Sequence, residues 1–164
     1  MRDRFGVVQV NEAGGVAGCN VEMVLRDSQV DPKVGVDAAK ALVDLDGVQV
    51  LLGAVSFGVS MPILTPVTVP GNVFQMSCCS SSTAFTKLAE ERKTKGLFFR
   101  TFLTTGVPAA VVAKVPMDQG YKSVAILYKN DDWGQDLQNL IAKDFEALGI
   151  TVTAAAAISD GQPS

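Results

Sequence analysis

The chain contains 164 residues, 48% of them hydrophobic, with a formal net charge of −3 and no histidine. This length and composition allow a sizeable buried core, in one large domain or two small ones. The acidic balance argues against nucleic-acid binding, which needs a clustered basic surface, and the lack of histidine excludes Ser-His-Asp and Cys-His catalytic sites and most zinc sites.

Helix and strand patterns alternate along residues 1–103. Gly14 and Gly15 end a first helix, because a left-handed helix cap needs glycine. Asp31 and Pro32 are typical of a helix start, where aspartate caps the first turn and proline fits its first position. The predicted elements are, in order, a helix over 1–13, a strand Val21–Leu25, a helix from Pro32 to Gly47, a strand Val48–Leu52, a helix Val59–Val69, a strand Val73–Met76 and an extended segment Leu97–Thr101.

The same alternation continues to the last strand. The predicted elements are a helix from Thr104 to Met117, a strand Ser123–Tyr128, a helix Trp133–Leu148, a strand Thr151–Ala157 and a final loop Asp160–Ser164. Continuously apolar strands that alternate with helices are typical of parallel sheets covered on both faces. The sequence therefore predicts an α/β fold with doubly wound, flavodoxin-like parallel sheets.

Three loops follow predicted strands at the sheet edge where ligands of such folds bind, namely Ala54–Ser60, Ser77–Thr83 and Asn130–Gly134. The second loop is rich in hydroxyl groups, from Ser80 to Thr83. Unpaired N–H groups at a helix start bind carboxylate or phosphate without a charged side chain, and hydroxyl donors add to them. The alternative, which stays open, is that one of these residues only caps the following helix.

The other two loops allow the same two interpretations. Ser56–Ser60, "SFGVS", opens a helix after a buried strand, and it is either a second anion-holding turn or an ordinary strand-to-helix connection. Trp133, the single tryptophan, follows a strand end. Its ring either contacts a ligand or packs against the protein.

Signals for an enzyme are weak. The glycine-rich segment Gly14–Gly18 follows a helix and precedes a strand, which is the reverse of the dinucleotide fingerprint. Asp131 and Asp132 are adjacent and have no second acid at a set distance. No cofactor or metal is therefore expected, and an α/β enzyme with Cys78 or Ser81 as nucleophile remains the less favoured alternative.

The three cysteines form no CxxC motif, so a thiol redox motif is not expected. Cys78 and Cys79 are neighbours, and such neighbours rarely bond to each other. A disulfide from Cys19 to one of them in an oxidising compartment stays open.

Six segments, taken together and in order, resemble the periplasmic branched-chain amino-acid (Leu/Ile/Val) binding proteins, the type I solute-binding receptors of ABC importers. The segments are "NEAGGVAG", "VEMVLRDSQVDPKVGVDAAKALVD", "VQVLLGAVSFGVS", "FFRTF", "YKSVAILYKNDDWGQDL" and "FEALGITV". The resemblance implies a type I periplasmic-binding-protein fold, with two lobes joined by hinge strands and ligand held between them. Residues 1–103 would form most of the N-terminal lobe and residues 104–164 the start of the C-terminal lobe.

The resemblance also implies a set of ligand-binding residues. Ser56, Phe57 and Gly58 match the family's serine-rich turn, although Phe57 replaces the usual ligand-binding serine. The serine turn after Cys79 matches a second contact, in which Ser80 offers backbone groups and Ser81 a hydroxyl. Trp133 matches an aromatic residue that covers the ligand side chain.

Compared with that family, the chain is expected to be incomplete at both ends, lacking the central first strand of its first sheet and the later ligand contacts. Such a sheet should expose its edges and self-associate. The resemblance implies a periplasmic or extracellular receptor that is not an enzyme. Its expected partners are a small ligand, such as an amino acid or related carboxylate, and an ABC transporter permease. A ligand-sensing regulator of the same fold is the alternative.

Overall fold

The computed structural model describes residues 2–159, so the loop predicted at 160–164 lies outside the described residues. Two π-helical turns, η1 and η2, directly continue α2 and α3. The elements in chain order are α1 (Arg2–Glu12), α2 (Pro32–Lys40), η1 (Ala41–Leu45), β1 (Val50–Leu52), α3 (Phe57–Ile63), η2 (Leu64–Thr68), β2 (Phe74–Ser77), α4 (Ala84–Glu90), β3 (Phe98–Arg100), α5 (Gly106–Asp118), β4 (Ser123–Lys129), α6 (Asp132–Ala147) and β5 (Thr151–Ile158).

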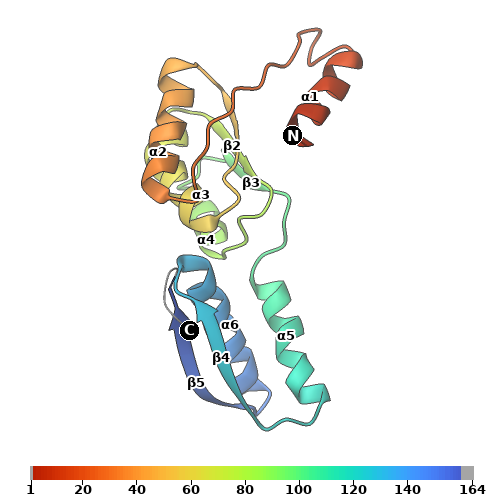
Figure 1. Cartoon of the computed structure of the whole chain (residues 1–164), viewed down its shortest axis with the longest axis vertical. Coiled ribbons are helices and arrows are strands. Elements are labelled where there is room, and N and C mark those ends of the chain that lie inside the picture. Colours follow the sequence, from red (N-terminus) through yellow and green to blue (C-terminus); the bar gives the residue numbers. More distant parts are fainter. Residues whose placement is uncertain (1, 160–164) are drawn as a thin grey trace.

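The described strands form two parallel sheets, one with the order β1-β2-β3 and one of β4 and β5. In the first sheet Leu51 lies opposite Gln75, which in turn lies opposite Phe98. Figure 1 shows this sheet with α2, α3 and α4 in one half of the molecule, and α5, β4, β5 and α6 in the other half. The parallel strands and alternating helices confirm the predicted α/β fold.

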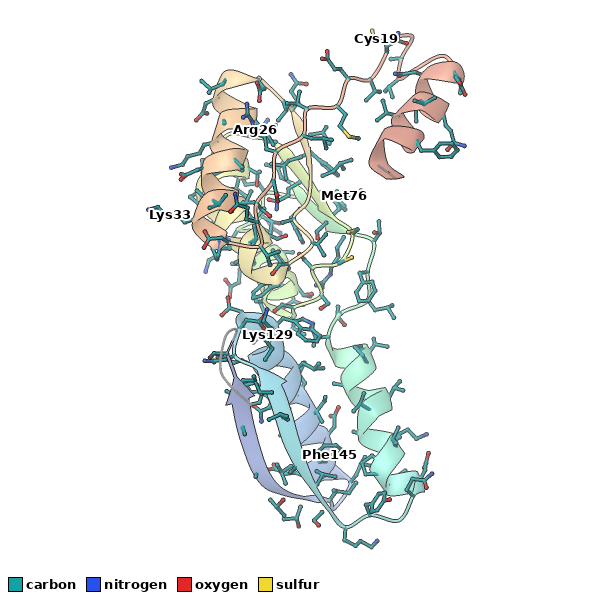
Figure 2. The ribbon with its side chains drawn as sticks, viewed as in Figure 1. Cys19, Arg26, Lys33, Met76, Lys129 and Phe145 are labelled. Atoms are coloured by element: carbon teal, nitrogen blue, oxygen red, sulfur yellow. The ribbon has the colours of Figure 1, made fainter. Side chains whose placement is uncertain are left out.

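Three apolar clusters hold these layers together. Their buried members are Ala39, Leu51, Val59, Ile63, Val67 and Val73 between α2, α3 and β1; Phe57, Leu64 and Phe85 between α3 and α4; and Ala109, Ala113, Ile141, Phe145 and Ile150 around α5 and α6. In the second cluster the ring of Phe85 stacks on Phe98 with centroids 4.1 Å apart, which ties α4 to β3. Phe145, labelled on α6 in Figure 2, is buried in the cluster around α5 and α6.

The strand predicted at Val21–Leu25 is wrong, because this segment pairs with no strand in the described part of the chain. It is held at its two ends instead. The Asn11 side chain exchanges two hydrogen bonds with the Val21 backbone, at 2.9 and 2.7 Å, and Arg26 forms an ion pair of 2.7 Å with Asp46. A β-strand exists only through hydrogen bonds to a neighbour, and here nothing in the described structure fills the place beside it.

A cavity of about 570 Å³ separates this segment from β1, and α2 forms part of its wall. The β1 edge that faces it carries exposed apolar side chains, with Leu52 69% exposed. Leu25 across the cavity is also exposed. The first sheet therefore ends at an apolar, unpaired edge.

The helix predicted over Val59–Val69 begins two residues earlier, at Phe57, and changes to a π-helical turn at Leu64. Pro62 lies inside α3 and Pro66 inside η2. Because proline lacks an N–H, it cannot continue the regular helical ladder. The ladder shifts instead, and the Val69 N–H donates to the Leu64 carbonyl at 3.0 Å.

Helix α1 confirms the helix predicted at the start of the chain. Figure 1 shows it projecting away from the rest of the molecule. Phe5 and Val8, three residues apart on this helix, are both exposed. Among the described helices, none is long and apolar enough to cross a membrane.

Candidate functional site

The serine turn, Ser80–Ser82, follows the carboxyl end of β2, as the sequence predicts, and its three serines are buried. Ser80 Oγ donates to Ser60 Oγ at 2.8 Å, which joins this turn to α3. Ser77 Oγ donates to the Ala54 carbonyl at 2.6 Å and accepts from the Ser80 N–H at 3.0 Å. Thr105 Oγ1 donates to Ser81 Oγ at 3.3 Å. The hydroxyls of Ser80 and Ser81 thus hold the turn in place by bonds within the protein.

The backbone N–H groups of this turn behave differently from its hydroxyls. Ser81 and Ser82 are only 3% and 2% exposed. Among the hydrogen bonds of the described residues, neither of their N–H groups donates to an acceptor. Buried N–H groups without acceptors are rare and costly in folded proteins. An anion with two oxygens would supply the acceptors that this turn lacks.

One residue of the turn also serves the next helix, as the alternative interpretation held. Ser82 Oγ accepts from the Ala84 N–H at 3.2 Å at the start of α4. Thr83, the residue in the cap position, makes no side-chain capping bond. Capping of α4 therefore uses the Ser82 hydroxyl and no backbone N–H group of Ser81 or Ser82.

Arg100, which sequence reasoning missed, holds the carbonyl side of the turn. Its guanidinium donates to the carbonyls of Ser82 at 2.7 Å and Ser80 at 3.3 Å, and to Thr86 Oγ1 at 2.7 Å. Burial lowers the pKa of Arg100 from its ordinary value, because the charged form loses solvation. The available signal was its position as the last residue of β3, beside the carboxyl end of β2.

The Ser56–Gly58 turn begins α3 and lies against the serine turn through the Ser60–Ser80 contact. Ser56 makes no side-chain capping bond, so the first N–H groups of α3 have no acceptor from it. Phe57, at the position where the family usually has a ligand-binding serine, is buried. It is 8% exposed, and its ring meets Phe85 edge-on with centroids 5.2 Å apart. An apolar ring at this position is more stable in the core than at an open surface.

Helix α6, which begins in the third predicted loop (Asn130–Gly134), contacts Thr83 after the serine turn. The Asp131 carboxylate caps this helix by accepting from the Gly134 N–H at 2.8 Å. Asp136, a second residue that sequence reasoning missed, accepts from both the N–H and the Oγ1 of Thr83 at 3.2 Å. Trp133, 44% exposed, precedes Asp136 by three residues and so shares its helix face. Through Asp136, helix α6 therefore contacts Thr83, the residue that follows the serine turn.

The cysteines form no disulfide among the described residues. Cys79 is exposed, and its Sγ lies 3.1 Å from Cys78 Sγ. Figure 2 shows Cys19 beside α1, well away from Met76 of β2. The described residues also contain no group of three or more metal-ligating side chains.

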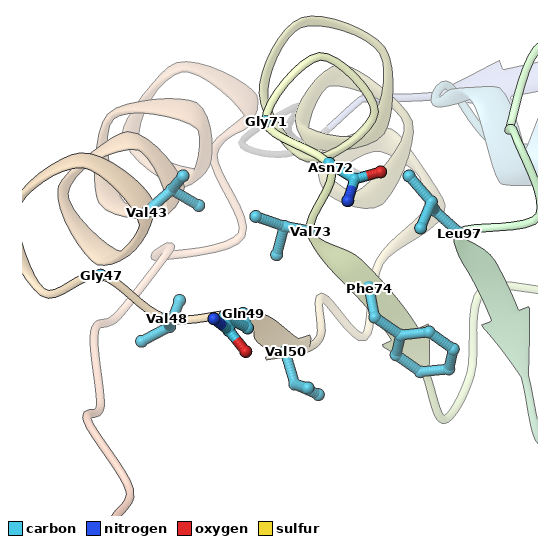
Figure 3. A pocket seen from close by; sticks show the side chains of 10 residues that line it. All are labelled: Val43, Gly47, Val48, Gln49, Val50, Gly71, Asn72, Val73, Phe74 and Leu97. Carbon is cyan, nitrogen blue, oxygen red and sulfur yellow. The ribbon is translucent and has the colours of Figure 1, made fainter.

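Two cavities lie in the described part of the chain. Ala54, Val55 and Cys78 of the first two loops line one of them, but the predicted ligand-binding residues line neither. One is the cavity between Val21–Arg26 and β1. The other, of about 590 Å³, opens at the amino-terminal ends of β1 and β2, where Val48 and Phe74 contribute to its wall (Figure 3). The candidate site is thus a set of backbone donors that belong to buried residues at the carboxyl end of β2.

Residues 4–164 match the family model described as periplasmic binding protein. The leucine-, isoleucine-, valine-, threonine- and alanine-binding protein of Pseudomonas aeruginosa is 27% identical over 149 residues, which cover 90% of this chain and 38% of that protein. A Leu/Ile/Val-binding protein of Rhizobium johnstonii is 31% identical over 157 residues, 94% of this chain and 41% of that protein. The chain thus spans about two fifths of these relatives.

Solved structures share the same arrangement. The solute-binding protein of an ABC transporter from R. palustris, in complex with 4-hydroxybenzoate, superposes with a TM-score of 0.84 at 25% identity, over 98% of this chain and 43% of that one. A branched-chain amino acid transporter substrate-binding protein from Streptococcus pneumoniae, in complex with isoleucine, gives a TM-score of 0.81 at 16% identity, over 97% and 43% of the two chains. The second likeness shows the fold alone.

Proposed function

The chain belongs to the periplasmic binding protein family, and from this premise we propose that it captures a small carboxylate-bearing solute for an ABC importer. The solute would be an amino acid, such as a branched-chain one, or a related carboxylate. Relatives named for leucine, isoleucine and valine, and a structural neighbour that holds 4-hydroxybenzoate, support this class of ligand. The feature common to these ligands is a carboxylate beside an apolar body.

The observation that carries the proposal is the pair of backbone N–H groups at Ser81 and Ser82, which belong to buried residues and donate to no acceptor in the described structure. A carboxylate accepts hydrogen bonds from two adjacent N–H groups, and such charge-assisted bonds are among the stronger ones in proteins. The positive guanidinium of Arg100, bonded to the carbonyl of Ser82, adds a favourable charge behind the turn. The hydroxyls of Ser80 and Ser81 serve to position these donors.

In this proposal the remaining predicted residues shape the site around the carboxylate. The N–H groups at Ser56–Gly58 provide a second set of donors beside the first. Trp133 would cover the apolar body of the ligand from α6. Cys79 contributes its backbone, which the Ser77 hydroxyl positions. Phe57 supports the site from the core rather than by touching ligand.

The wider role follows from the family. We propose that residues 1–103 belong to one lobe and residues 104–164 to a second, that a permease of the ABC class is the partner, and that the protein works in the periplasm or outside the cell. We further propose that the exposed edge of β1 makes this chain self-associate. The role is binding rather than catalysis. The enzyme alternative with Ser81 as nucleophile is disfavoured, because that hydroxyl is buried and bonded to Thr105.

Calorimetry with matched ligand pairs tests the proposal. Leucine is compared with leucinamide, and 4-hydroxybenzoate with 4-hydroxybenzamide, so that only the carboxylate changes within each pair. We expect at least one acid to bind this chain and its amide to bind at least about tenfold more weakly, which corresponds to about 1.4 kcal/mol. Equal binding of acid and amide, or binding of a sugar or nucleotide but neither acid, would contradict the proposal.

A further inference from the structure

Two thiols lie together directly before the serine turn. Cys78 Sγ and Cys79 Sγ are 3.1 Å apart, and both residues are exposed. This separation exceeds the roughly 2.05 Å of a disulfide bond, so the sulfurs are in contact without being bonded. Cys19, also exposed, has no such neighbour and lies beside α1 (Figure 2). The chain therefore holds one paired and one solitary thiol position.

The backbone around the pair is fixed by the neighbouring serine. Ser77 Oγ accepts from the N–H of Cys79 at 3.4 Å and from that of Ser80 at 3.0 Å, while it donates to the Ala54 carbonyl at 2.6 Å. These bonds tie the start of the turn to the loop after β1. Because the backbone is already ordered, bringing the two sulfurs to one acceptor atom costs little further conformational entropy.

An acceptor atom that suits the two sulfurs of Cys78 and Cys79 is chemically soft and polarisable, and binds two thiolates without further protein ligands. Thiolates select soft acceptors. A tetrahedral zinc ion with Zn–S bonds of about 2.3 Å would hold two sulfurs about 3.8 Å apart and would want four ligands. The pair is closer than that, and among the described residues no third cysteine or carboxylate joins it in a ligating group. A pyramidal acceptor with a narrower angle between its sulfurs is the better match.

We propose that Cys78 and Cys79 form a chelating dithiol site for trivalent arsenicals. With phenylarsine oxide, two As–S bonds form while the two S–H bonds and the As–O double bond break. The two thiol protons leave with the oxygen as one water molecule, so arsenic stays trivalent and no oxidant or reductant is needed. The site stands on the sulfur geometry alone and does not depend on the proposed solute-binding function.

Chelation gives this site a signature that a single thiol lacks. The second As–S bond is formed within one molecule, so it benefits from a high effective concentration of the neighbouring thiol. A monothiol in solution then competes poorly for the arsenic, whereas a small dithiol competes well. A lone cysteine holds phenylarsine oxide through one bond and loses it to either competitor.

Intact-mass spectrometry with phenylarsine oxide tests the site in the reduced, folded chain. We expect one phenylarsenic group per chain, retained in excess glutathione and removed by 2,3-dimercaptopropanol. Cys19→Ser should behave like the unsubstituted chain. Cys78→Ser and Cys79→Ser should each bind at least about a hundredfold more weakly in the presence of glutathione.

Two results would overturn the proposal. One is loss of the arsenic from the unsubstituted chain to glutathione alone, a result that needs no variant to fold. The other is retention in Cys78→Ser or Cys79→Ser equal to that of the unsubstituted chain.

Discussion

Gln75 lies in the middle of β2 and is completely buried. Its side chain accepts from Thr68 Oγ1 at 2.8 Å and donates to the carbonyls of Gly53 at 3.1 Å and Ser60 at 3.3 Å. It thereby joins η2, β2 and the loop that leads to α3. A polar side chain in this position is favourable only while all of its partners are present.

We therefore expect Gln75→Leu to lower the free energy of unfolding by about 1–3 kcal/mol, because it leaves the buried polar groups that bond to Gln75 without partners. Gln49→Leu is the matched control, since Gln49 is exposed, and its effect should stay within about 0.5 kcal/mol. Urea denaturation followed by circular dichroism measures both. Equal effects of the two substitutions would show that the buried network contributes no stability.

Arg100 offers a second prediction at the scale of single residues. Its two bonds to the turn and its bond to Thr86 of α4 require a planar fork of donors, which lysine does not have. If Arg100 positions the Ser81 and Ser82 N–H groups, Arg100→Lys and Arg100→Met should both weaken binding of a carboxylate ligand about tenfold. Calorimetry with the acid that binds most tightly measures this. Arg100→Lys binding as tightly as the unsubstituted chain would reduce the role of Arg100 to its charge.

The location of the serine turn could be predicted from the sequence, because hydroxyl residues after an apolar run mark a strand end. The atoms of the turn that are left without hydrogen-bond partners could not be predicted from the sequence. The sequence offers the hydroxyls from Ser80 to Thr83 as donors, and the family resemblance assigns backbone groups to Ser80 and a hydroxyl to Ser81, whereas the structure bonds the Ser80 and Ser81 hydroxyls to Ser60 and Thr105. Which partners a side chain finds depends on residues distant in the chain. The same reason explains why Asp136 was missed.

At the scale of elements, apolar runs between turn residues were enough to predict the helices and most strands. Val21–Leu25 fails because a strand requires a neighbour, and this requirement is not visible in its own residues. Across the cavity, β1 has no partner on that side in the described structure. Edges of this kind pair with other chains unless charge or proline blocks them.

We expect the chain to self-associate through this edge and Leu52→Lys to weaken the association at least about tenfold, because a lysine on an edge strand opposes pairing. Asn139→Lys, at an exposed position of α6, adds the same charge elsewhere and should have no effect. Sedimentation velocity over a range of concentrations gives both values. A monomeric unsubstituted chain, or equal weakening by the two lysines, would rule out the β1 edge as the interface.

At the scale of the whole molecule, the two halves contact each other where Asp136 of α6 accepts two hydrogen bonds from Thr83. This contact links the serine turn to α6, and with it to Trp133. Hydrogen bonds to a charged group contribute more than neutral ones. The contact therefore sets how the second sheet sits relative to the candidate anion site.

A double-mutant cycle with Thr83→Val and Asp136→Ala measures this link. We expect a coupling of roughly 1 kcal/mol in the free energy of unfolding, since Thr83→Val removes one of the two bonds and leaves the N–H donor. As a control, Thr83→Val is paired with Asp144→Ala on the same helix, and this pair should be additive. A coupling indistinguishable from zero for Thr83 and Asp136 would show that the two halves are not joined there.

The central claim is that the Ser81 and Ser82 N–H groups hold a carboxylate, and NMR titration of the ¹⁵N-labelled chain tests it most directly. With leucine or 4-hydroxybenzoate, we predict saturable downfield shifts of the amide protons of Ser81 and Ser82, the direction expected when an N–H gains a charged acceptor. The corresponding amide ligand should leave these two resonances nearly unchanged. A carboxylate that binds and saturates elsewhere on the chain, while both resonances stay in place, would contradict the account.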